Sequence, residues 1–132
     1  MPGQTLTRAV ESDREPQEIY EVLAEVRNIP QWAPVFADTI QRLDDTHWIV
    51  TKGGENFRLE AILHPAAGTA DYVREMGNNL RGGACLRVIP RPLGGSTVTM
   101  TVPLGPGARE TEVGRTVEQE LAQLVRLARS RR

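Results

Sequence analysis

The stretch Arg27-Asn28-Ile29-Pro30-Gln31-Trp32-Ala33-Pro34-Val35-Phe36 decides the fold of this chain. It follows a short amphipathic run whose apolar members are Ile19, Tyr20, Val22, Leu23 and Val26. Asn28 and Pro30 are expected to end that first helix, because proline lacks a backbone donor and its ring clashes with the preceding turn. The chain then restarts in an aromatic turn that has to bury Trp32 and Phe36. The sequence therefore predicts a single N-terminal strand followed by two short helices that are broken at this point. Few folds have this arrangement.

Length and composition favour one domain over residues 1–132. The chain has 132 residues, of which 39% are hydrophobic, as in an ordinary globular domain. Its formal net charge is −1, so no overall positive charge draws it to nucleic acid or to anionic lipid. No apolar run approaches the ~20 residues of a membrane-spanning helix. We therefore expect neither nucleic acid nor membrane insertion.

The single cysteine and the single lysine of the chain limit its possible sites and indicate its origin. Cys85 is the single cysteine, which excludes an intrachain disulfide and a cysteine-based zinc site, and we expect it to be a small buried hydrophobe. The N-terminus has neither the basic nor the apolar region of a signal peptide, so a cytoplasmic location is expected. Lys52 is the only lysine among 16 basic residues, a bias typical of a GC-rich genome, and we expect a bacterial one.

Alternating apolar residues separated by turn residues predict an antiparallel sheet. A first strand over Thr5–Ser12 leads to a helix from about Pro16 to Arg27, with Ser12 or Asp13 as its N-cap. The other predicted strands are Thr39–Leu43, Trp48–Lys52, Phe57–Leu63, Ala70–Met76, Ala84–Ile89 and Thr97–Val102. A long helix from about Arg109 to Arg129 follows, because its apolar residues recur at helical spacing.

This order of elements predicts an α+β fold. A seven-stranded antiparallel sheet wraps around the long C-terminal helix, and two short helices follow the first strand. The long helix has to pack across one concave face of the sheet. A curved sheet that grips a helix tends to leave space between the two, and the broken helix pair would close one end of that space.

Several stretches resemble the SRPBCC superfamily, the helix-grip group of START lipid-transfer domains, birch-pollen-type allergens and polyketide cyclase/dehydratases. Pro16–Val26 with Asn28–Pro34 resembles its beginning. Gly83–Pro90, Gly94–Thr101 and Val117–Leu121 resemble its last hairpin and closing helix. The resemblance covers essentially the whole chain. It implies a cavity for a small hydrophobic or aromatic molecule, and no cofactor is expected.

Polar residues on the predicted strands are the candidates for catalysis, if the protein is an enzyme. Arg74 and Arg87 each follow an apolar residue by one position. Facing inward, either could hold an enolate or carboxylate; facing outward, it would form a surface ion pair worth little. A register slip of one residue reverses the facing. Tyr72 is either a core aromatic or the phenolic donor of a cyclase pocket, and His64 ends a strand before Pro65.

An aromatic and soft apolar set is the candidate for ligand contact: Trp32, Phe36, Trp48, Phe57 and Met100. Trp32 is expected at the mouth of the cavity, touching ligand; the alternative is a wedge that fixes the angle between the two short helices. No His-Glu-x-x-His, Cys-x-x-Cys or carboxylate cluster occurs in the sequence, so no metal site is expected.

Three functions remain at this stage. The first is binding of a small hydrophobic or aromatic metabolite between the sheet and the C-terminal helix. The second is a cofactor-free enzyme of the polyketide cyclase/dehydratase type, acting on an aromatic or poly-keto substrate. Its case is reduced by short loops such as Asp44-Asp45-Thr46, which leave little room for a lid. The third is an interaction module with a filled core. A homodimer through a sheet edge or the long helix is left open.

Overall fold

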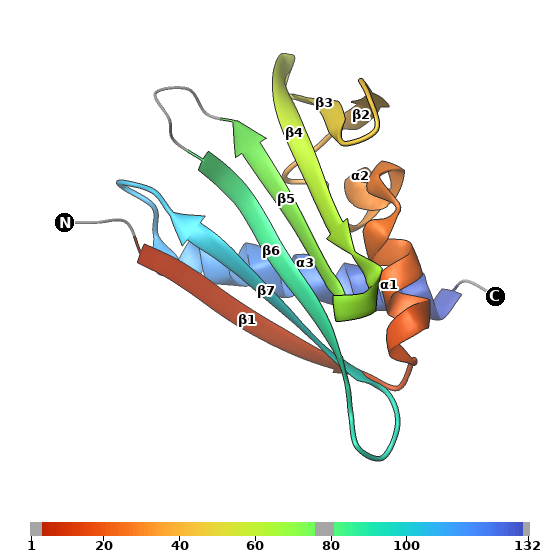
Figure 1. Ribbon diagram of the computed structural model, residues 1–132. Helices are drawn as coiled ribbons and strands as arrows, with labels where there is room; N and C mark the ends of the chain where they lie inside the picture. Colours follow the sequence, from red (N-terminus) through yellow and green to blue (C-terminus); the bar gives the residue numbers. More distant parts are fainter. Residues whose placement is uncertain (1–3, 76–80, 131–132) are drawn as a thin grey trace.

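A computed structural model describes residues 4–75 and 81–130. Its strands form one antiparallel sheet in the order β1-β7-β6-β5-β4-β3-β2. Their bounds are β1 Gln4–Ser12, β2 Thr39–Arg42, β3 His47–Lys52, β4 Glu55–His64, β5 Thr69–Glu75, β6 Arg81–Pro90 and β7 Ser96–Leu104. The sheet curves around the long helix α3 (Glu110–Ser130), which crosses one of its faces (Figure 1). The predicted α+β helix-grip architecture is confirmed.

The helices after β1 differ in detail from the sequence-based prediction. They are α1 (Pro16–Ala24), a 3-10 turn η1 (Val26–Asn28) and α2 (Ile29–Trp32). The first helix ends at Ala24, because Glu25 is extended, with φ −80° and ψ 101°. Pro30 lies in the first turn of α2, where a missing donor costs nothing, so it begins the second helix and does not end the first.

The predicted N-cap of α1 is also wrong. Glu15 caps the helix, in a reciprocal capping box with Glu18 that satisfies backbone N–H groups at both residues. Ser12 instead accepts a hydrogen bond from the Arg14 N–H at 3.1 Å. The carboxylate of Glu15 reaches further and accepts from the Gly95 N–H at 2.8 Å, which ties the start of α1 to the β6–β7 hairpin.

Two buried side chains fix the break between the short helices. Asn28 is buried, and its amide donates to the carbonyl of Val22 at 3.1 Å, which satisfies one of the free carbonyls near the end of α1. Trp32 is 3% exposed and joins the same core. The sequence Asn-Ile-Pro-Gln-Trp therefore anchors this corner by one hydrogen bond and one large apolar side chain.

Strand register decides which side chains face α3. Leu59 lies opposite Arg74, Ala61 opposite Tyr72, and Leu63 opposite Ala70. The concave face packs on one apolar stripe of α3, whose buried members are Val117, Leu121, Leu124, Val125 and Ala128. Each fully buried leucine contributes about 1.5–3 kcal/mol of hydrophobic stabilisation.

Gly114 interrupts that stripe for a steric reason. Arg8 on β1 faces α3, and its guanidinium lies against the helix at this position. A Cβ at residue 114 would be 2.7 Å from Nη2 of Arg8. Glycine costs about 1 kcal/mol relative to alanine in a helix, and here it makes room for the arginine. Arg8 then pairs with Glu118, Nε to Oε2, at 3.2 Å.

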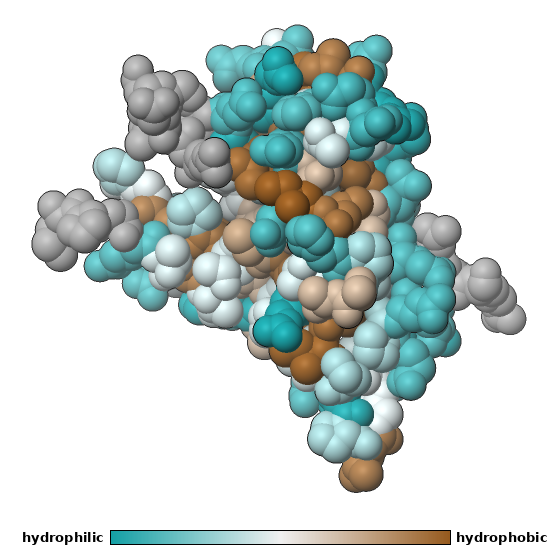
Figure 2. All heavy atoms as spheres, viewed as in Figure 1, coloured by the Kyte–Doolittle hydropathy of each residue, from teal (hydrophilic) through white to brown (hydrophobic). Residues whose placement is uncertain are grey.

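The face of the sheet turned away from α3 is mostly polar. Figure 2 shows hydrophilic side chains over most of it and a hydrophobic group near its middle. Cys85 lies on this face and is exposed, so the prediction of a buried cysteine is wrong. The reason is alternation along β6, where Leu86 and Val88 take the inward positions. In the described part of the chain, no helix has both the length and the apolar character to cross a membrane.

Candidate ligand site beside the C-terminal helix

Arg74 is a charged side chain on the inward face of the sheet. It shares this face with Tyr72, two residues earlier on β5, and it lies between Leu59 of β4 and Gly82 of β6. Its guanidinium carbon is 4.0 Å from the ring centroid of Phe57. Its Nε is buried and has no hydrogen-bond partner among the described residues. Of the two orientations left open by the sequence, Arg74 takes the inward one.

Phe57 connects Arg74 to the chain that follows α2. Its ring meets Phe36 edge to face, with the centroids 5.3 Å apart and the planes at 70°. Phe36 belongs to residues 33–38, which we call the mouth segment. Both phenylalanines are partly buried against the core. The structure thus brings together two members of the predicted apolar set and one predicted polar residue.

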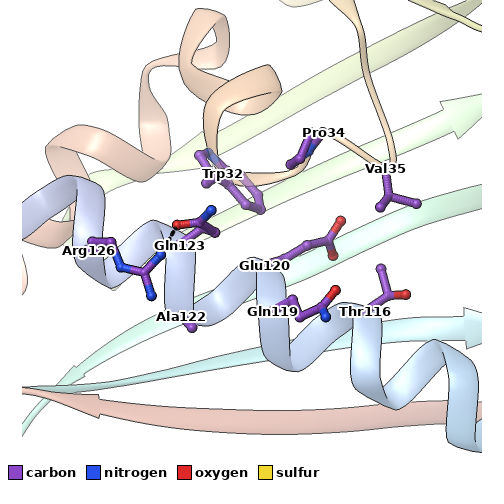
Figure 3. A pocket seen from close by; sticks show the side chains of 9 residues that line it. All are labelled: Trp32, Pro34, Val35, Thr116, Gln119, Glu120, Ala122, Gln123 and Arg126. Carbon is purple, nitrogen blue, oxygen red and sulfur yellow. Dashed lines mark hydrogen bonds between the residues drawn. The ribbon is translucent and has the colours of Figure 1, made fainter.

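A cavity of about 300 Å³ opens between the mouth segment and α3. Figure 3 shows Trp32 and Pro34 on one side of it and side chains of α3 on the other. Its lining consists of Trp32, Pro34, Val35, Thr116, Gln119, Glu120, Ala122, Gln123 and Arg126. Val35 is 60% exposed at the rim. Trp32 therefore lines this cavity and also belongs to the buried core, and its contact with a ligand stays a prediction.

Glu120 is the residue of this cavity that the sequence analysis missed. Its carboxyl group points toward the mouth segment, between Pro34 and Val35 (Figure 3). Removal from water raises the pKa of Glu120 to about 7. A signal was present in the sequence, because Glu120 lies three residues after Val117 and four before Leu124. That spacing puts a glutamate at the edge of the apolar stripe.

Lys52 holds the mouth segment from the end of β3. Its Nζ donates to the carbonyl of Pro34 at 2.8 Å and lies 3.0 Å from Oδ1 of Asp38. The other oxygen of Asp38 accepts from the Gly53 N–H at 2.9 Å. The hydrogen bond from Gly53, and then the one from Lys52, lower the pKa of Asp38. The only lysine of the chain thus fixes the segment that borders the cavity.

The hydroxyl of Tyr72 is committed to the fold. Tyr72 is 3% exposed, and its hydroxyl donates to the carbonyl of Leu23 near the end of α1. Burial raises the pKa of Tyr72 above its ordinary value of 10.0. Tyr20 links the same two elements in the other direction, because its hydroxyl, on α1, donates to the carbonyl of Thr69 on β5 at 2.8 Å. These two phenols fasten α1 to the sheet.

Of the predicted site residues, Trp32 alone lines this cavity. Arg87 is exposed on the outer face, between Thr69 and Thr99 in the sheet, and His64 is exposed at the turn after β4. Trp48 is buried under Arg27, whose guanidinium carbon is 5.2 Å from the indole centroid. Met100 is 1% exposed at the centre of β7. Of the four residues named for catalysis, only Tyr72 and Arg74 share the inward face.

A second hollow, of about 620 Å³, lies between α1 and the turn after β4. Tyr20, Ala24, Pro65 and Val88 are among its lining residues. It is larger than the cavity under the mouth segment, but none of its lining residues belongs to the predicted site and Glu21 is the only one that carries a charge. The cavity at Trp32 therefore remains the candidate site.

No family model matches the sequence, and no curated protein matches it significantly. Solved structures do match. The Zhui aromatase/cyclase from Streptomyces sp. R1128 is 15% identical, with a TM-score of 0.74 over 97% of this chain and 94% of that one. A START superfamily protein from Mycobacterium smegmatis is 14% identical, with a TM-score of 0.72 over 97% and 98%. The di-domain ARO/CYC BexL, from the BE-7585A biosynthetic pathway, is 20% identical, with a TM-score of 0.68 over 93% of this chain and 45% of that one.

These sequence identities are too low to transfer an activity to this chain. The structural matches do agree with the fold described above. The alignments cover almost the whole chain, so they include the sheet, the two short helices and the long helix α3. The chain has a START-like helix-grip fold.

Proposed function

We propose that the protein binds a small hydrophobic or aromatic molecule, which enters between the mouth segment and α3 and extends toward Phe57 and Arg74. The observation that carries the proposal is the inward position of Arg74. A cation turned into a protein is costly unless it is paired. Among the described residues no carboxylate pairs with Arg74, and a phenylalanine ring covers its guanidinium. A ligand with an oxygen acceptor would supply the missing partner.

The apolar surroundings suit the rest of such a ligand. Trp32, Pro34 and Val35 line the entrance, and Phe36 of the same mouth segment meets Phe57 of the sheet edge to face. Binding sites for small molecules commonly combine apolar walls with a few polar groups that fix orientation. Trp32, Phe36 and Phe57 are therefore the proposed ligand contacts, whereas Trp48 and Met100 are proposed as packing residues behind them.

The test is a titration with 1-anilinonaphthalene-8-sulfonate, an aromatic anion whose fluorescence rises on binding. Arg74→Met is expected to weaken saturable binding about tenfold, the effect of one charge-assisted hydrogen bond. Arg87→Met is the matched control, because it removes the same side chain from the opposite face. Equal affinities for the two variants, or no saturable binding by the wild type, would contradict the proposal.

An enzyme of the polyketide cyclase/dehydratase type is the second candidate. Arg74 also favours it, because a fixed guanidinium can stabilise the enolate formed when a poly-keto chain closes. Two of the neighbouring structures are described as aromatase/cyclase proteins. If the protein is such an enzyme, Arg74 acts on the substrate. Tyr72, Arg87 and His64 then have no direct role in catalysis. Full turnover by Arg74→Met would exclude it.

A cytoplasmic location and assembly as a homodimer remain predictions. The sheet offers β1 and β2 as its outer strands, and either could pair with a second copy. Light scattering after size-exclusion chromatography measures the assembly directly.

A further inference from the structure

Glu120 has apolar side chains opposite it and no partner for its charge among the described residues. It faces Trp32, Pro34 and Val35 across the cavity. None of the hydrogen bonds and ion pairs between described residues involves its carboxyl group. A half-buried carboxylate in such a setting loses part of its hydration without gaining a protein donor, so a molecule in the cavity that donates to it is favoured.

The polar residues around Glu120 leave this need unmet. Arg126 is the only cation that lines the cavity, and its guanidinium donates to Gln123 on the same helix. Figure 3 shows that pair turned away from the carboxyl group of Glu120. Thr116 and Gln119 flank Glu120 on α3 without a hydrogen bond to it. The cavity thus presents one charged acceptor, with no protein donor among the described residues, to whatever enters it.

We propose that Glu120 selects ligands whose outer end carries a hydroxyl group, which donates a hydrogen bond to the carboxylate while the aromatic body of the ligand packs on Trp32. This inference rests on the proposed binding function and names the chemical class of ligand at the entrance. Thr116 and Gln119 add neutral donors and acceptors beside it. The outer end of the ligand is thereby distinguished from the inner end, where Arg74 favours an acceptor.

Discrimination follows from the penalty for leaving the carboxylate unpaired. A hydrogen bond to an ionised group is about twice as strong as one between neutral groups. A site that accepts a hydrogen bond from a ligand hydroxyl discriminates against an analogue without the hydroxyl proton. The bound analogue shields the acceptor from water and offers it no donor. A methyl ether keeps the oxygen and the aromatic body and removes only the donor.

The experiment compares 2-naphthol with 2-methoxynaphthalene at about pH 8, where Glu120 is mostly ionised. Quenching of tryptophan fluorescence reports binding, and isothermal titration calorimetry checks the affinities. The wild type is expected to prefer 2-naphthol about tenfold. Glu120→Leu is expected to bind both compounds with similar affinity. Glu112→Leu, at an exposed position on the same helix, is the control and should keep the preference.

The outcomes separate this inference from the binding function itself. If the wild type binds both compounds equally, or if Glu120→Leu keeps the preference, the role of Glu120 is overturned and binding stands. If neither compound binds to any variant, both proposals fail. Glu120→Gln gives a second test, because it preserves the shape of the side chain and should show an intermediate preference. Circular dichroism of each variant establishes that it is folded.

Discussion

The guanidinium of Arg74 lies over the ring of Phe57, 4.0 Å from its centroid, on the concave side of the sheet. Phe57 is itself held edge-on by Phe36. An aromatic face attracts a cation by its quadrupole and replaces part of its hydration. The pair therefore holds a positive charge at a defined position on the concave side of the sheet, which an isolated flexible arginine could not maintain.

This relationship predicts a measurable coupling between the two residues. Phe57→Leu and Arg74→Met should each lower the free energy of unfolding, and the double variant should lose less than their sum. A coupling of about 0.5–1 kcal/mol is expected for a partly desolvated cation–π pair. Urea denaturation of the four proteins measures it. Simple additivity would mean that the stacking contributes nothing to stability.

Glu120 predicts a pH dependence of stability with an unusual sign. Its folded-state pKa is raised to about 7, so the folded state holds a proton that the unfolded state has released. Its contribution is therefore favourable in acid and is lost as the pH rises toward 7. Glu120→Gln should be more stable than the wild type by about 1–2 kcal/mol near pH 8 and equal to it near pH 4.

Thermal unfolding across that range measures the effect. Glu112→Gln is the control, because it makes the same substitution at an exposed position of the same helix. A Glu120→Gln variant that is less stable than the wild type at pH 8 would show that the ionised carboxylate has a stabilising partner.

Tyr72 is predicted to act on stability and not on binding. Tyr72→Phe removes the donor to the carbonyl of Leu23 and leaves a buried acceptor unpaired. The expected cost is about 1–3 kcal/mol, with unchanged affinity for an aromatic ligand. Tyr20→Phe is the comparison; its site is half-buried, so water can replace the lost bond to Thr69 and the loss should be smaller. A large drop in the ligand affinity of Tyr72→Phe would show instead that the Tyr72 hydroxyl contacts the ligand.

Lys52 predicts a change in the mobility of the mouth segment. Lys52→Met breaks the links to Pro34 and Asp38, but both lie near solvent, so stability should fall by less than ~1 kcal/mol. The amide protons of residues 33–38 should exchange faster, and a bound ligand should dissociate faster. Hydrogen exchange followed by mass spectrometry resolves the segment. Unchanged exchange would mean that Phe36 alone holds it.

Most of the fold was accessible from the sequence. Period-two alternation and turn residues marked the strands, and β2 to β7 lie side by side in chain order. The pairing of β1 with β7 joins the two ends of the chain and has no local signal in the sequence. The boundaries in the N-terminal corner were less accessible. Pro30 stops a helix or starts one with equal ease, and the extended conformation of Glu25, which decides between the two, has no signature in its residue type.

The candidate site was only partly accessible. Alternation along β6 already placed Cys85 and Arg87 opposite to Leu86 and Val88, so reading the cysteine by residue type alone led to the wrong face. Arg74 required the register of β5 against β4, which depends on contacts distant in sequence. Glu120 was visible as a glutamate beside an apolar stripe, but only the position of the mouth segment shows what it faces.

The contact between Arg8 and Gly114 has a consequence for how this sequence can change over time. A methyl group at residue 114 would lie 2.7 Å from Nη2 of Arg8, which is the far end of a flexible side chain and can swing aside. Alanine at this position would therefore disturb the ion pair between Arg8 and Glu118, which is largely exposed and worth little, and would gain the helix propensity that glycine forgoes. The two positions can change in either order. A designer who wants a more stable α3 can therefore begin with Gly114→Ala on the helix itself.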